Sequence, residues 1–184
     1  MLNRIKFSVK VTLQVLLVSL GAFFVFAIFL AIFGENAQRI VFLNPLINGF
    51  MHSGFEHILY NLLLIFLFLL ADINRPYDIN KIFWVTFLLS CTYLPIALLN
   101  ITEPAIGVSG TCYFLMSRFF FTREKYKAFN YIIFGILIVA EISTIANNDG
   151  IAHGVHLIGA VIGLISLNPD KYRILPNRVK RVIA

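Results

Sequence analysis

Six apolar stretches, separated by short polar segments, constrain the fold of this chain more than any other feature of its sequence. Of its 184 residues, 59% are hydrophobic and 13% are charged, a balance that soluble domains do not have. A membrane-spanning helix needs about 20 predominantly apolar residues. The candidate helices cover residues 11–34, 55–71, 81–99, 109–121, 129–146 and 151–168. We therefore predict an all-α membrane protein in which residues 1–184 form a single bundle of six transmembrane helices.

The fourth apolar stretch is shorter than a full membrane span. Gly107 and Gly110 stand where a full span would still lie within lipid, and Arg118 ends the apolar run. A helix that begins within the membrane exposes its first N–H groups, so it must face protein or a water-filled cavity. We expect this helix to begin in mid-membrane with Ser109 at its start.

The basic residues indicate how the chain crosses the membrane. Net charge is +6, which raises the question of nucleic acid or anionic lipid as a partner. With a cytoplasmic amino terminus and six crossings, every Lys and Arg except Arg39 falls on the cytoplasmic side. This bias is typical of a multi-pass protein in a lipid bilayer. We predict that both termini are cytoplasmic, that a basic tail from about residue 172 lies at the lipid headgroups, and that no nucleic acid is bound.

Four histidines gather near the outer ends of two predicted helices: His52, His57, His153 and His156. Polar groups at membrane depth are costly, so such a cluster favours a functional site. His57 and Asn61 are four residues apart and share one helix face, where two donors can converge on one point. His52, five residues before His57, lies off that face, and we expect it to support the loop.

The sixth helix carries a stripe of small residues that ends in a histidine. His156, Gly159 and Gly163 lie on one face, and the two glycines allow a neighbouring helix to approach closely. If the fourth helix is that neighbour, Ser109 lies opposite His156. Tyr113, one turn below the serine, can then pack beside the imidazole.

These residues carry a resemblance to the rhomboid family of intramembrane serine proteases. Rhomboids show His-x-x-x-x-His-x-x-x-Asn in the second core helix, Gly-x-Ser-Gly followed by a tyrosine in the fourth, and His-x-x-Gly-x-x-x-Gly in the sixth. The three motifs occur here in that order, within about residues 10–170, as His52, His57 and Asn61, as Gly107, Ser109, Gly110 and Tyr113, and as His156, Gly159 and Gly163.

The resemblance implies a role for each of these residues. Ser109 would be the nucleophile and His156 its general base, in a dyad without a third acid. The Ser109 backbone N–H and the side chains of His57 and Asn61 would form the oxyanion hole. The supporting or substrate-binding residues would be His52, Gly107, Gly110, Tyr113, His153, Gly159 and Gly163.

His153 departs from the family pattern, because bacterial members often have asparagine there. It would either donate to the oxyanion or substrate, or cap the helix end. The first outer loop, about residues 35–50, lacks the family's Trp-Arg pair, and Ile47 and Asn48 stand near that position. Glu56 and Glu141 are expected to be exposed or snorkelling carboxylates near outer helix ends, outside the site.

The implied activity is that of a serine endopeptidase that cleaves transmembrane segments of membrane proteins, in a bacterial plasma membrane, with no metal and no cofactor. The oligomeric state is left open. A catalytically inactive rhomboid-like binder is the alternative. A metalloprotease is disfavoured, because His52, Glu56 and His57 lack the His-Glu-x-x-His spacing. A transporter is disfavoured because the cytoplasmic half of the helices is apolar.

Overall fold

The computed structural model describes residues 2–37, 44–52, 54–71, 77–98, 107–122, 127–144 and 153–167. Within these ranges every regular element is a helix, so the all-α prediction is confirmed. The helices are α1 Leu2–Phe33, α3 Pro45–Asn48, α4 Phe55–Ala71, α5 Ile79–Leu98, α6 Ser109–Thr122, α7 Lys127–Thr144 and α8 His153–Ile165. The predicted basic tail from residue 172 lies outside the described residues.

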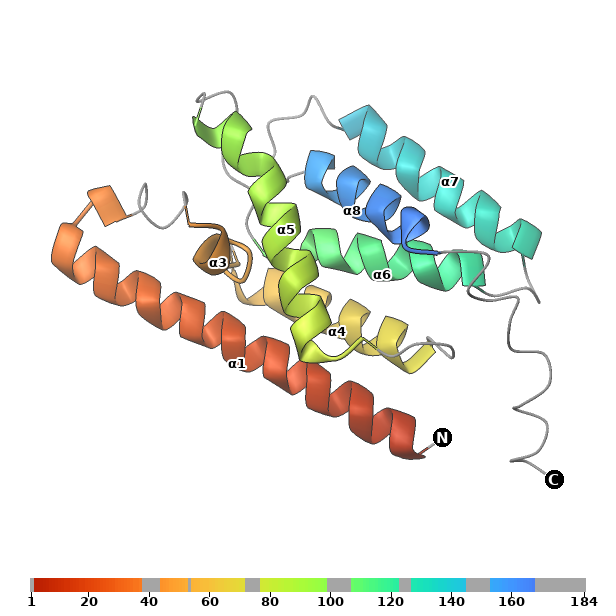
Figure 1. The fold of residues 1–184 in the computed structure, drawn as a ribbon, viewed down its shortest axis with the longest axis horizontal. Coiled ribbons are helices and arrows are strands. Elements are labelled where there is room, and N and C mark those ends of the chain that lie inside the picture. The colour runs from red at the N-terminus through yellow and green to blue at the C-terminus, as the bar shows by residue number, and fades with distance from the viewer. Residues whose placement is uncertain are drawn as a thin grey trace.

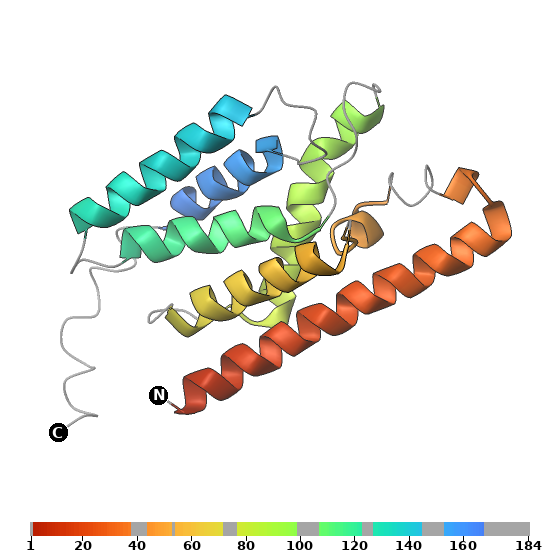
Figure 2. The same cartoon turned by 180° about the vertical axis from the view of Figure 1, so that it is seen from behind.

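Helix α6 is at the centre of the bundle. It contacts α4, α5, α7 and α8, and its contact with α8 is the most extensive between any two described elements. Figures 1 and 2 show α4, α6, α8 and α7 side by side, α1 along the outer side of α4, and α5 crossing at a steep angle. Most of α6 from Gly110 to Arg118 is buried as a result.

Successive helices run in opposite directions, and this brings four helix ends together. The first residues of α4, α6 and α8 and the last residues of α7 lie at the same end of the bundle in both views (Figures 1 and 2). We call this the site end. All three sequence motifs therefore reach one region of the molecule, although they are distant in the chain.

The surface of the bundle is apolar. Leu17, Phe24 and Val139 are 66%, 69% and 66% exposed, and large apolar patches of this kind mark surfaces that contact lipid or another protein. Among the described helices, α1 and α7 are long and apolar enough to cross a membrane by length and composition. α4, α8 and the first part of α5 are apolar but shorter. The six-span topology stays a prediction.

Two glycines of α8 allow its close packing on α6. A Cβ atom added at Gly159 would collide with the carbonyl oxygen of Gly110, and one added at Gly163 would collide with Ser117 and with the backbone of Phe114. The fourth and sixth apolar stretches are therefore the pair that the small-residue stripe joins. This packing sets the distance between the first turns of α6 and α8.

The segment that follows α1 folds back into the bundle. Asn44 caps the short helix α3, because its side chain accepts the N–H of Leu46 at 3.1 Å. Phe50 is completely buried and its ring lies 5.5 Å from the ring of Phe83 on α5. Residues 44–50 of the first outer loop are thus anchored against helix α5.

Candidate active site

Ser109 and His156 face one another at the site end. The Nε2 atom of His156 lies 2.9 Å from the Oγ atom of Ser109. The His156 ring stacks on the ring of Tyr113, with centroids 4.4 Å apart and planes inclined by 5°. His156 is 7% exposed, so the contact is shielded from bulk water and the imidazole has little freedom to turn.

The backbone before α6 positions the serine at a helix start. Gly107 has a φ of +95°, a conformation that side chains with a Cβ rarely adopt. Its N–H donates to the carbonyl of Asn48 at 3.2 Å. The first N–H groups of a helix lack intrahelical acceptors and carry partial positive charge. The Ser109 N–H is one of these groups, so a negative oxygen beside it would be stabilised.

Asn61 brings a buried amide donor from α4 to the same region. The residue is 4% exposed, and its Nδ2 atom has no hydrogen-bond partner among the described residues. Its Oδ1 atom accepts the S–H of Cys112 of α6 at 3.6 Å. Because a buried donor without an acceptor is costly, this amide is suited to a ligand oxygen. His57 lies one turn earlier on α4 and is half-buried.

His52 holds the chain between α3 and α4. Its Nδ1 atom lies 3.0 Å from the carbonyl oxygen of Phe50, and its ring centroid lies 5.1 Å from that of His57. Burial, and secondarily the neighbouring His57, lowers the pKa of His52 to about 4, so the ring is neutral near pH 7 and Nδ1 donates to the carbonyl. These contacts fit the loop-supporting role expected from the sequence.

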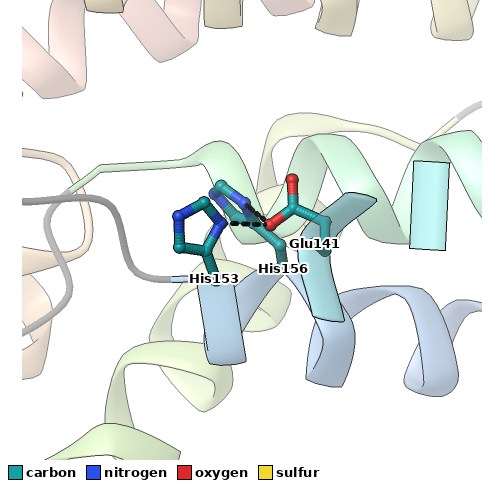
Figure 3. Close-up of side chains that lie close together, drawn as sticks. All are labelled: Glu141, His153 and His156. Atoms are coloured by element: carbon teal, nitrogen blue, oxygen red, sulfur yellow. Dashed lines mark hydrogen bonds and ion pairs between the residues drawn. The ribbon is translucent and has the colours of Figure 1, made fainter. Parts of the chain in front are cut away.

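Glu141 joins the site, contrary to the expectation that it is an exposed or snorkelling carboxylate outside the site. It lies in the last turn of α7 and is 9% exposed. Figure 3 shows its carboxylate directed at two imidazoles of α8. Its Oε2 atom lies 3.0 Å from Nδ1 of His156 and 2.7 Å from Nδ1 of His153. Its Oε1 atom accepts the hydroxyl of Tyr113. Glu56, in contrast, is exposed as expected.

His153 links two helices through its Nδ1 atom. Besides Glu141, this atom lies 3.2 Å from the Oγ1 atom of Thr144 at the end of α7. The sequence left two roles open for His153, donation to an oxyanion or substrate and capping of the helix end. The structure directs Nδ1 to Glu141 and Thr144 of α7, and both roles stay predictions.

The same carboxylate and imidazoles form a group that could hold a metal ion. One ligand atom each from Glu141, His153 and His156 lies within 4.8 Å of the others, and imidazole with carboxylate suits zinc. Both Nδ1 atoms here lie at hydrogen-bonding distance from one carboxylate oxygen, so hydrogen bonds account for these contacts without a metal ion. The hydrogen-bonded arrangement also leaves Nε2 of His156 directed at Ser109.

Sequence reasoning overlooked Glu141, although a signal was present. It is the one acidic residue in the α7 sequence KAFNYIIFGILIVAEIST, and a carboxylate in an apolar helix calls for a partner. Glu141 also lies near the outer end of its predicted helix, as the histidines do, and this position indicated that they could be its partners. The pairing itself depends on the packing of α7 against α8, which local patterns do not determine.

Comparison with protein families gives a match that covers the site. Residues 42–168 match the model described as Rhomboid domain, which is more than half of the chain and includes every candidate site residue. A search of curated proteins and a search of solved structures each found no match.

Proposed function

The chain belongs to the rhomboid family, and we propose that it is an intramembrane serine endopeptidase with Ser109 as nucleophile and His156 as general base. Rhomboid proteins are membrane-embedded, and the apolar surface of this bundle agrees with that setting. The observation that carries the proposal is the 2.9 Å contact between Oγ of Ser109 and Nε2 of His156. An alcohol becomes an effective nucleophile when an adjacent base accepts its proton.

The first half of the reaction forms an acyl-enzyme. The Ser109 hydroxyl proton moves to Nε2 of His156 as Oγ bonds to the substrate carbonyl carbon, and the carbonyl electrons move to the oxygen. The tetrahedral intermediate then collapses, the C–N bond breaks, and the leaving nitrogen takes the proton from Nε2. The acyl group remains on Ser109 as an ester. Water repeats the sequence in the second half, which releases the acid and restores the serine.

The developing negative oxygen requires donors. The proposed donors are the backbone N–H of Ser109 at the start of α6, the buried Nδ2 of Asn61 and the side chain of His57. The Asn61 amide supports this assignment, because its Nδ2 is buried with no acceptor among the described residues. Removal of one such donor typically costs about 10²–10³ in rate.

The proposed substrates are transmembrane proteins that enter the site from the bilayer. A stable helix keeps its carbonyls hydrogen-bonded within the membrane, so a segment must unwind locally before Ser109 can reach a peptide bond. We therefore expect cleavage where small and helix-destabilising residues occur in the substrate. Six transmembrane helices, with the site end toward the outer leaflet and both termini in the cytoplasm, form part of the same proposal.

A cleavage assay in lipid vesicles tests the function. The purified chain is reconstituted with a single-span reporter whose membrane segment contains glycine and proline, and product is measured for wild type, Ser109→Ala and Ser143→Ala. Ser143 is an exposed serine on α7, bonded to the carbonyl of Ala140, and serves as the matched control. We expect cleavage by wild type and Ser143→Ala but none by Ser109→Ala. Reporter binding without cleavage by the wild type would instead identify an inactive binder.

A further inference from the structure

Glu141 is the one carboxylate among the described residues that contacts the proposed base. A carboxylate in an apolar bundle is strongly destabilising unless hydrogen bonds compensate for the lost water. All three donors that the structure gives Glu141 are side chains of the site: the hydroxyl of Tyr113 and the Nδ1 atoms of His153 and His156. The carboxylate is therefore an integral part of the site.

The contact with His156 determines which nitrogen of that imidazole is the base. Neutral imidazole carries one proton. With Nδ1 at 3.0 Å from Oε2 of Glu141, this proton is held on Nδ1 and the lone pair remains on Nε2. Nε2 is the atom that lies 2.9 Å from Oγ of Ser109. Glu141 thus selects the tautomer that the proposed reaction requires.

The carboxylate also acts when the imidazole becomes charged. As Nε2 receives the serine proton, the resulting imidazolium stands beside a negative oxygen in a site largely shielded from water, where such attraction is strong. The Tyr113 ring lies flat against the imidazole and Glu141 fixes its Nδ1 edge. Ring orientation and charge stabilisation thus both depend on residues outside the Ser109–His156 pair.

We infer that Glu141 is a positioning residue that converts the expected dyad into a Ser109–His156–Glu141 triad. The inference rests on the proposed function for its kinetic consequence, although the tautomer it assigns to His156 is a property of the resting protein. It differs from the dyad without an acid that the family resemblance implied, and the acid comes from α7, the helix that precedes the histidine helix.

Two alternative roles for the Glu141 cluster lead to different experimental outcomes. Glu141 lies closer to His153 than to His156, so it could serve only to join α7 to α8. The three residues could also bind a divalent cation. A purely joining role predicts that His153 substitutions match those of Glu141, and a metal-binding role predicts that activity depends on a metal.

Kinetics on the reconstituted full chain test the inference. We expect Glu141→Gln to lower kcat by up to about 10⁴-fold, the loss found when a triad aspartate is replaced by asparagine, with KM changed only a few-fold. Glu141→Asp keeps the negative charge, so its kcat should be at least tenfold higher than that of Glu141→Gln. Glu35→Gln removes the same charge from an exposed site after α1 and should leave kcat unchanged. His153→Gln should lower kcat by less than tenfold, because the hydrogen bond between Glu141 and His156 remains.

A spectroscopic measurement separates this inference from the proposed function. Nuclear magnetic resonance of protein labelled with ¹⁵N-histidine reports which ring nitrogen carries the proton, and the signals of His156 are those that disappear in His156→Ala. In wild type we expect His156 to be protonated at Nδ1. In Glu141→Gln we expect this preference for Nδ1 to be lost. An Nδ1-protonated His156 that depends on Glu141 in a protein that cleaves nothing would refute the protease proposal alone. The inference is overturned if Glu141→Gln has the same kcat and the same His156 tautomer as wild type. It is also overturned if His153→Gln lowers kcat as much as Glu141→Gln does, or if 1,10-phenanthroline abolishes cleavage and added zinc restores it.

Discussion

Nε2 of His156 lies 2.9 Å from Oγ of Ser109 although 47 residues separate them in the chain. Two features bring them together. The left-handed backbone of Gly107 starts α6 at the serine, and the absence of a side chain at Gly159 lets α8 approach the carbonyl of Gly110. The site therefore depends on backbone features as much as on its reactive side chains, and both can be tested by substitution.

Asn61→Ala should lower kcat by about 10²–10³-fold, because it removes a donor to the negative oxygen of the transition state. KM should change much less, since the interaction forms fully only in that state. The measurement is steady-state cleavage of the reporter in vesicles. Asn130→Ala is the matched control: this buried amide of α7 donates to the carbonyl of Phe120 at 3.4 Å, away from the site. Equal kcat values for the two variants would show that Asn61 is not part of the oxyanion hole.

Tyr113→Phe should preserve the ring that stacks on His156 while removing the hydroxyl that donates to Glu141. A hydrogen bond to a charged group contributes about 1.5–3 kcal/mol to stability, and without it Glu141 is held less firmly against His156, so we expect kcat to fall. Tyr113→Ala also removes the ring that stacks on His156, so its kcat should be lower still. If the Phe variant were as active as wild type, the hydroxyl would have no part in holding Glu141.

Gly159→Ala should destabilise the protein and reduce cleavage, because its Cβ would collide with the Gly110 carbonyl and force α8 away from α6. Overpacking of this kind costs about 1–3 kcal/mol. Gly135→Ala on α7, where nothing lies within 4 Å of an added Cβ, should be neutral or stabilising by about 0.5–1 kcal/mol. Unfolding in mixed micelles measures both. A Gly159 variant as stable as its control would contradict the close packing.

Gly107→Ala should damage the site through backbone strain. A left-handed conformation costs a residue with a Cβ about 1–2 kcal/mol, and the added Cβ would also lie 3.0 Å from the carbonyl oxygen of Met51. Gly34→Ala provides the control, because Gly34 has a φ of +56° with open space around it. Both variants should lose stability, but only Gly107→Ala should also lose cleavage. Loss of cleavage in both would mean that strain alone, at any position, disrupts the fold.

Much of the site was predictable because its signals are local. The stacking of His57 and Asn61 on one helix face, the small-residue stripe of the sixth apolar stretch and the serine between two glycines all follow from helix periodicity and from the lack of a side chain in glycine. Only the identity of the neighbouring helix had to be assumed, and α6 and α8 do lie together.

Buried charges were not predictable in the same way. Glu141 was expected to be an exposed or snorkelling carboxylate, and Arg118 was expected only to end the fourth apolar stretch on the cytoplasmic side, yet they are 9% and 2% exposed. Nη1 of Arg118 donates to Oγ of Ser166 at 2.7 Å, and its guanidinium lies 4.8 Å from the centroid of the Tyr77 ring. The partners of each charge come from distant segments of the chain, so this compensation depends on tertiary packing.

Labelling by a fluorophosphonate shows whether Ser109 is activated, because this reagent reacts with an activated serine whatever the substrate is. The intact protein is treated in vesicles, and mass spectrometry of its peptides locates the adduct. We expect the adduct on Ser109 in wild type, with labelling slowed by at least about 10²-fold in His156→Ala, because the base then no longer accepts the serine proton. An unmodified Ser109 in wild type, or equal labelling with and without His156, would show that Ser109 is not a nucleophile activated by His156.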